Sequence, residues 1–209
     1  MAAKAELPHI TGFTLKIGEL NGSFPELIPL AQCQDNSLWH QNSSVLDHTV
    51  SVLNQIGKEV KYASPKTKSY LSQNVDKKYT RLDLLLVAGL LHDISKPETI
   101  KTDSKGHTTF IYHEDIGASR ATKILKRFDL SSIERDFVAT MVLNHSVLHN
   151  ITNQENTSAK EDTLKLNRFF PEFFKESIIL AKADTAGSEL KSLNPSDYQR
   201  RINFYNMFL

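Results

Sequence analysis

Apolar residues recur at helical spacing through most of the chain after residue 44. The first such series consists of Val45, His48, Val52, Ile56 and Val60. This spacing of three to four residues predicts an amphipathic helix that begins after Ser44. A second helix is expected over Thr80–Ile94, where apolar side chains lie nearly all round the axis, so this helix should be central. Pro97 is expected to end that segment.

The pattern changes after Pro97. Thr, Ile, Phe and Tyr side chains flank the sequence Asp103-Ser104-Lys105-Gly106, which predicts one small β-hairpin (about 98–112) with a glycine turn. Helical spacing returns at His113 and continues to about Phe128. A further helix is expected to start at Ser131 or Ser132 and to end near His145.

The last part of the chain is expected to be a loop followed by three helices. The polar stretch Asn150 to Glu161 predicts the loop. The helices are expected around the aromatic residues Phe169–Phe174, over Ile178–Ala186, and from about Pro195 to Phe208. The aromatic residues of the first and last of these helices are an interface or part of the core, and core packing is favoured.

Residues 1–38 contain several Gly and Pro residues and predict an irregular arm. Its one helical start is Phe24–Leu27, with Ser23 as cap and Pro25 in the first turn. We expect this arm to pack on a domain formed by residues 39–209. The pattern as a whole predicts a mostly α fold, a single helical bundle with minor strand content.

Composition excludes several functional classes. The 209 residues carry 25 Lys and Arg against 24 Asp and Glu, so nothing suggests a polyanion-binding or membrane-surface protein. The single cysteine, Cys33, rules out an internal disulfide and fits a reducing cytoplasm, where we expect the protein to be. The first twenty residues do not resemble a signal peptide. The most apolar stretch, Leu82–Leu91, is too short to span a bilayer.

Six residues that commonly bind metals lie at the ends of apolar helices or inside them. They are His48, His92, Asp93, His113, His145 and Asp184. Imidazole and carboxylate groups hold divalent first-row metals well. Asp93 directly follows an apolar run, and burying it is costly unless a positive charge such as a metal ion faces it. Taken singly, each residue has a structural interpretation: a histidine on a helix is more often structural, Asp93 would pair with Lys96, and Asp184 would cap a turn. The order of all six residues along the chain favours metal binding.

Three sequence motifs carry a resemblance to a known family. They are Val45-Leu46-Asp47-His48-Thr49, Leu90-Leu91-His92-Asp93-Ile94-Ser95-Lys96-Pro97 and Ala183-Asp184. In this order they resemble the HD superfamily of metal-dependent phosphohydrolases, over about residues 38–190. The resemblance implies a helical HD-domain bundle that uses a metal-activated water.

Further segments are similar to the HD domain of bacterial CCA-adding enzymes and related tRNA nucleotidyltransferases. These are Trp39-His40-Gln41, Lys96-Pro97-Glu98-Thr99, Phe110-Ile111-Tyr112-His113-Glu114 and Gly117-Ala118. However, only 39 residues precede His40, and they contain no Gly-Ser plus paired-Asp motif. We therefore expect a stand-alone HD domain without CCA-adding activity.

The resemblance also implies roles for individual residues. His48, His92, Asp93 and Asp184 would hold a first metal ion, and His113 and His145 a second, with Asp93 bridging the two. His149 is the alternative to His145, since both would share a helix face. The expected cofactor is one or two divalent transition metal ions (Mn, Fe, Ni, Co or Zn), with Mg as an alternative.

The resemblance leaves the remaining polar residues with two interpretations each. Lys96 would contact phosphate as a catalytic point charge, or it is a surface lysine or a partner of Asp93. His40 and His149 would be substrate-binding residues or a general acid, or they have neither role. These roles stay open at this point.

The function implied is phosphatase or phosphodiesterase activity on a nucleotide or similar phosphoester, with an RNA 2′,3′-cyclic end also considered. Balanced charge favours a small substrate over a long nucleic acid. Two alternatives use the same fold: a non-catalytic nucleotide-binding regulatory module, and a two-iron oxygenase. Metal identity and dioxygen dependence would separate the oxygenase from the hydrolase.

Overall fold

The computed structural model describes residues 4–37, 39–153 and 157–209, and helices dominate it. The α-helices are α1 Gly12–Lys16, α2 Val45–Tyr62, α3 Pro65–Leu71, α4 Arg81–Leu91, α5 Lys96–Thr99, α6 His113–Leu125, α7 Ser132–Asn144, α8 Val147–Ile151, α9 Ala159–Phe169, α10 Phe174–Gly187, α11 Leu190–Leu193 and α12 Pro195–Asn206. Two short 3₁₀ helices, η1 Glu19–Gly22 and η2 Pro25–Ala31, precede α2. The predicted mostly α fold is confirmed.

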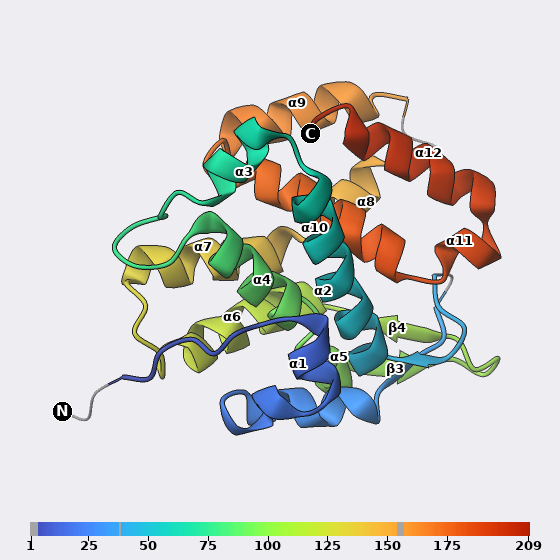
Figure 1. The fold of residues 1–209 in the computed structure, drawn as a ribbon. Coiled ribbons are helices and arrows are strands. Elements are labelled where there is room, and N and C mark those ends of the chain that lie inside the picture. Colours follow the sequence, from blue (N-terminus) through green and yellow to red (C-terminus); the bar gives the residue numbers. More distant parts are fainter. Residues whose placement is uncertain (1–3, 38, 154–156) are drawn as a thin grey trace.

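Helix α2 runs through the middle of the molecule and organises the bundle (Figure 1). It packs against α1, α4 and α10, while α6 and α7 pack against each other. Ser44 caps it by accepting a hydrogen bond from the backbone N–H of Asp47 at 3.0 Å. The helix predicted after Ser44 is therefore confirmed.

Helix α4 is central, as its apolar sequence predicts, because seven of its eleven residues are buried. Thr80 and Asp83 form a capping box at its start. The helix ends at Leu91, three residues earlier than expected. Pro97 does not end the segment but lies in the first turn of α5, a position where the missing proline N–H costs nothing.

The predicted hairpin is confirmed. Strand β3, Ile100–Thr102, pairs antiparallel with β4, Thr108–Phe110. Gly106 in the connecting turn has φ +84°, a conformation that glycine adopts without strain. A second small sheet pairs β1, Gln34–Asp35, with β2, Ser43–Ser44.

The N-terminal segment has more regular structure than predicted. It contains α1, η1 and η2, and its buried residues Leu15, Phe24 and Leu30 belong to the main core cluster. The expected cap at Ser23 is wrong: Phe24 is the N-cap residue of η2, without a side-chain cap bond. Asn36 binds the hairpin, since its backbone N–H donates to Thr108 Oγ1 at 2.8 Å. The division at residue 38 stays a prediction.

Other differences from the prediction are smaller. Helices α3 and α11 were not predicted, and α6 ends at Leu125 rather than near Phe128. The predicted loop 150–161 is partly helical, since α8 reaches into its start and α9 begins within its end. Residues 154–156 of that loop lie outside the described part of the chain.

The aromatic helix predicted around Phe169–Phe174 is wrong. Helix α9 ends at Phe169, and α10 begins at Phe174. Pro171 explains the break, because the residue before a proline is disfavoured in the helical conformation. Phe169 is 77% exposed, whereas Phe174 and Tyr205 are buried together in a second core cluster with Leu148, Ile178 and Ala181. Across the described ranges, none of the helices combines the length and apolar character that a membrane span needs.

Candidate metal centre

The six predicted metal-binding residues come from five parts of the fold and meet around one cavity. His48 lies in α2, His113 is the first residue of α6, and Asp184 lies in α10. His92 and His145 are the C-cap residues directly after α4 and α7, and Asp93 follows His92. All are buried except His113, which is half-buried. Five of them, all but His92, line a cavity of about 970 Å³.

The first group of potential ligands consists of His48, His92 and Asp93. The Nε2 atoms of His48 and His92 are 3.4 Å apart. Asp93 Oδ2 lies 3.2 Å from His92 Nε2 and 3.8 Å from His48 Nε2. These three potential ligand atoms are therefore close enough together to bind one metal ion.

The second group consists of Asp93, His113 and His145. The Nε2 atoms of the two histidines are 3.2 Å apart. The other carboxylate oxygen, Asp93 Oδ1, lies 3.6 Å from His113 Nε2 and 3.7 Å from His145 Nε2. Asp93 thus presents one oxygen to each group, which is the arrangement that a bridging carboxylate needs.

Three of the histidines are oriented by the same local hydrogen bond. The Nδ1 atoms of His92, His113 and His145 lie 2.9, 2.7 and 2.7 Å from the backbone carbonyl oxygens of Gly89, Phe110 and Val142, each three residues earlier. A carbonyl oxygen only accepts, so Nδ1 carries the hydrogen in each ring. Whenever such a ring carries no second proton, its Nε2 atom offers a lone pair to the group, as in histidines that bind metals.

This geometry fits a metal ion. The Nε2 atoms of His113 and His145 are too close to face each other as two acceptors, so a proton or a cation must lie between them. Ligand atoms that each lie about 2.1 Å from one ion stand roughly 3.0–3.4 Å apart. The shortest separations in the two groups, 3.2 and 3.4 Å, match that spacing.

The charges around Asp93 favour its ionised form. Burial alone would raise the pKa of Asp93, but His92 and Lys96 hold this pKa well below its usual value. Burial of His145, followed by the charge of His92, lowers the pKa of His145 to about 4, so this ring is neutral near pH 7. A neutral imidazole beside a carboxylate is the state that binds a metal ion.

Lys96 forms ion pairs with two carboxylates in the structure. Its Nζ atom lies 2.9 Å from Asp93 Oδ2 and 3.0 Å from Asp35 Oδ2, and it is 4.8 Å from the ring centre of Phe110. Burial would lower the pKa of Lys96, but Asp93 and Asp35 outweigh burial and raise it. Lys96 does pair with Asp93, and its role as a phosphate contact stays a prediction.

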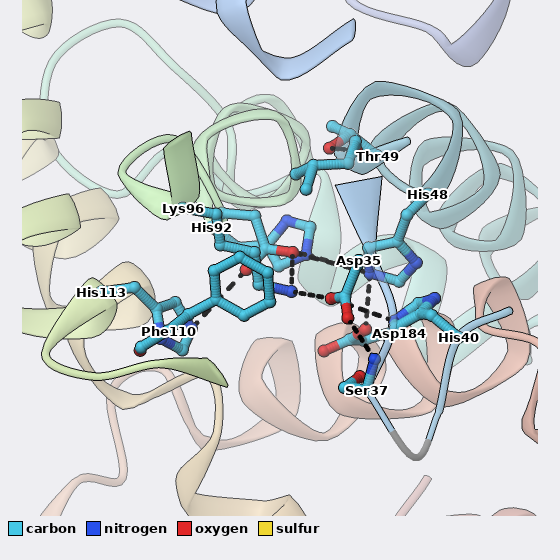
Figure 2. A network of polar contacts seen from close by, with 12 residues as sticks. Asp35, Ser37, His40, His48, Thr49, His92, Lys96, Phe110, His113 and Asp184 are labelled. Atoms are coloured by element: carbon cyan, nitrogen blue, oxygen red, sulfur yellow. Dashed lines mark hydrogen bonds and ion pairs between the residues drawn. The ribbon is translucent and has the colours of Figure 1, made fainter. Parts of the chain in front are cut away.

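Asp35 is a residue of the site that sequence analysis missed. Figure 2 shows it between Lys96 and His40, with Ser37 below it. Its carboxylate accepts hydrogen bonds from Lys96 Nζ at 3.0 Å and from the backbone N–H of Ser37 at 2.9 Å. Asp35 is 61 residues from Lys96 in sequence. Its short strand carries no pattern that predicts this contact.

Asp184 lies beside the first group without belonging to it. Among the described residues, neither of the two groups of potential metal ligands includes Asp184. Its Oδ1 atom lies 2.9 Å from His48 Nε2, and its Oδ2 atom lies 2.9 Å from His149 Nε2. Its assignment as a metal ligand stays a prediction. The structure places His145 in the second group and His149 outside it, against Asp184.

His40, which precedes α2 in the chain, also lines the cavity. Its ring centre is 4.6 Å from that of His48, and its Nε2 atom lies 3.9 Å from Asp35 Oδ2. Burial, followed by the charge of His48, lowers the pKa of His40 to about 4. A neutral ring at the cavity wall is compatible with the predicted substrate contact.

Comparison with known proteins agrees with this geometry. The HD domain family matches residues 45–185, which is most of the chain, so this protein belongs to the HD domain family. Members of this family are typically metal-dependent phosphohydrolases. No curated protein matches the chain, and the more specific likeness to CCA-adding enzymes has no support from a relative. All six predicted ligands fall inside the matched range.

Proposed function

We propose that this protein is a metal-dependent phosphohydrolase that cleaves a small phosphoester. The observation that carries the proposal is Asp93, which directs one carboxylate oxygen at His48 and His92 and the other at His113 and His145. In this arrangement the first group would hold one divalent ion and the second group another, with Asp93 shared. Asp184 would complete the first group through the oxygen that now contacts His48.

When bound, a divalent ion supplies a Lewis acid and a water whose pKa is lowered to roughly 7. The residues of the chain orient the potential ligands and balance the charge of the site for that chemistry. The backbone carbonyls fix the three histidine rings, and Lys96 balances the charge of Asp93. Asp35 in turn holds Lys96 against Asp93.

We further propose that His40 and His149 contact the substrate, because both line the cavity that contains the metal groups. Lys96 lines it too, and we retain it as a candidate phosphate contact. A phosphate that reached Lys96 would compete with Asp35 and Asp93 for its three N–H donors. The charge-balancing role of Lys96 is therefore the one that the observed contacts favour.

Metal analysis and a substrate screen test this proposal together. Protein purified without chelator is expected to contain one or two transition metal ions per chain. The same protein should hydrolyse phosphoesters when it is assayed with Mn²⁺, Ni²⁺, Co²⁺ or Mg²⁺, and chelator should abolish the rate. The screen should include phosphomonoesters, cyclic nucleotides and RNA 2′,3′-cyclic ends.

Two results would contradict the proposal. Correctly folded protein that binds none of these ions would refute the metal centre itself. Protein that binds iron and turns over only with dioxygen would instead be a two-iron oxygenase, with the same ligands in a different reaction.

A further inference from the structure

The cavity extends well beyond the metal groups. Its outer wall is formed by residues that lie before and after the HD-family match. These are Asp35, Ser37, Trp39, His40, Leu190, Leu193, Asn194, Asp197 and Arg201. A cavity of about 970 Å³ lies at the upper end of the range for small-molecule sites, about 300–1,000 Å³. A phosphate group alone would leave most of this volume empty.

Trp39 is the large aromatic side chain of that outer wall, and it is half-buried. The guanidinium carbon of Arg201 lies 4.7 Å from the centre of its ring. Arg201 is itself fixed, because it donates hydrogen bonds to Asp197 Oδ2 at 3.0 Å, to Thr152 Oγ1 at 2.7 Å and to the carbonyl oxygen of His149 at 3.0 Å. The indole is therefore held in a defined position against a buried cation.

A short series of contacts joins Trp39 to the metal groups. The ring centres of Trp39 and His149 are 4.8 Å apart, with the rings nearly perpendicular. His149 Nε2 lies 2.9 Å from Asp184 Oδ2, and Asp184 Oδ1 lies 2.9 Å from His48 Nε2. Two side chains, His149 and Asp184, thus connect the indole to the first group, and both line the same cavity as Trp39.

We infer that Trp39 forms a stacking site for a nucleobase, so that the substrate is a nucleotide whose phosphate faces Asp93 and whose base lies against the indole. This inference rests on the proposed hydrolase function and specifies its substrate. A flat indole held by Arg201 suits a base, because every base offers a π-face to an aromatic side chain. Asn150 and Asn153 line the same cavity, and amides supply both donors and acceptors for the edge of a base.

The single tryptophan makes this site directly observable, because Trp39 is the only one in the chain. Each of the four common ribonucleosides should be added to the native protein while tryptophan fluorescence is recorded. Nucleosides have no phosphoester to hydrolyse, so binding is measured without turnover. We expect quenching by one or more nucleosides and none by ribose 5-phosphate, which has no base.

A kinetic test separates base recognition from general damage. The readout is the ratio of kcat/KM for a nucleoside 5′-monophosphate to kcat/KM for ribose 5-phosphate. We expect Trp39→Leu to lower this ratio by roughly five- to 150-fold, which corresponds to the stacking of one base, and Trp39→Phe to lower it less, because phenylalanine keeps a smaller π-face. Tyr62→Leu is the matched control: Tyr62 is an exposed ring with Lys61 Nζ 5.4 Å from its centre, and it does not line this cavity.

The outcomes distinguish this inference from the proposed function. Hydrolysis of phosphoesters without quenching by any nucleoside would overturn the base site and leave the hydrolase intact. Quenching without hydrolysis would support the base site and contradict the hydrolase. Equal quenching by ribose 5-phosphate, or an unchanged ratio in Trp39→Leu, would also overturn the inference.

Discussion

The inner and outer halves of the cavity differ in where their residues come from. The inner half, with Asp93 at its centre, is built from residues within or directly after helices α2, α4, α6, α7 and α10, all inside residues 45–185. The outer half, with Trp39 and Arg201, comes from the segments before and after that range. In our proposal the inner half would hold the metal ions, and the outer half would bind the base together with Asn150 and Asn153 from the family range. The flanking segments would thus add substrate selection to a reaction that the family range supplies.

The strongest test of the inner half is Asp93→Asn. The amide keeps the shape of the side chain but removes the negative charge that both groups share. We expect bound metal and phosphoester hydrolysis to be lost, measured by elemental analysis and by the rate of phosphate release. Asp129→Asn is the control, since Asp129 is exposed and paired with Lys78 on the surface. Full activity of Asp93→Asn would refute the assignment.

The second prediction divides the inner half itself. His113→Ala removes one of the three ligands of the second group and leaves the first group complete. We expect the metal content to fall by one ion per chain and the rate to fall with it. His107→Ala, an exposed histidine on the neighbouring hairpin, should change neither quantity. Unchanged metal content and rate in His113→Ala would leave a centre with a single ion.

Asp35→Asn tests whether the outer segment also supports the inner half. The substitution removes one of the two carboxylates that hold Lys96. We expect metal affinity or activity to fall by up to about tenfold, because Asp35 acts on Asp93 only through Lys96, whereas loss of a group bonded directly to a metal ligand typically costs about 10- to 100-fold. Metal titration and steady-state rates measure this effect. Asp162→Asn, at a surface pair with Lys165, is the control. A normal metal affinity and rate would restrict Asp35 to the outer half.

The smallest effect is expected for Arg201→Lys. Lysine keeps the charge but loses the planar group over Trp39. We expect KM for a nucleotide to rise about two- to fivefold, since the indole stays in the cavity and loses only part of a cation–π contact with a side chain that remains charged. Metal content should not change. Arg200→Lys is the matched control, because Arg200 also binds Asp197 but does not line the cavity. A loss of metal in Arg201→Lys would contradict the division into two halves.

Sequence analysis predicted the inner half better than the outer half, for a physical reason. His92, Asp93 and His145 interrupt or end apolar helices, so their unusual position is visible within a few residues. Asp35 gains its role only from Lys96, 61 residues away, and no local pattern records that contact. Arg201 lies in a polar helix whose charged residues look alike until the fold places this one against Trp39.

Prediction of the secondary structure succeeded and failed in a similar way. The helices α2 and α4 were predicted because their apolar spacing and caps are local features. The break between α9 and α10 was missed because the run of phenylalanines suggested one helix across Pro171. The proline removes a backbone donor and restricts the residue before it, and this local effect outweighed the apolar pattern.

The hydrogen bonds from three histidine Nδ1 atoms to carbonyl oxygens three residues earlier have a thermodynamic consequence. Gly89 and Val142 lie in the last turns of α4 and α7, where backbone carbonyls have no partner within the helix. The rings of His92 and His145 therefore satisfy these carbonyls whether or not an ion is bound. The rotamer entropy of these side chains is lost when the chain folds, so little of it remains to be lost when a metal ion arrives.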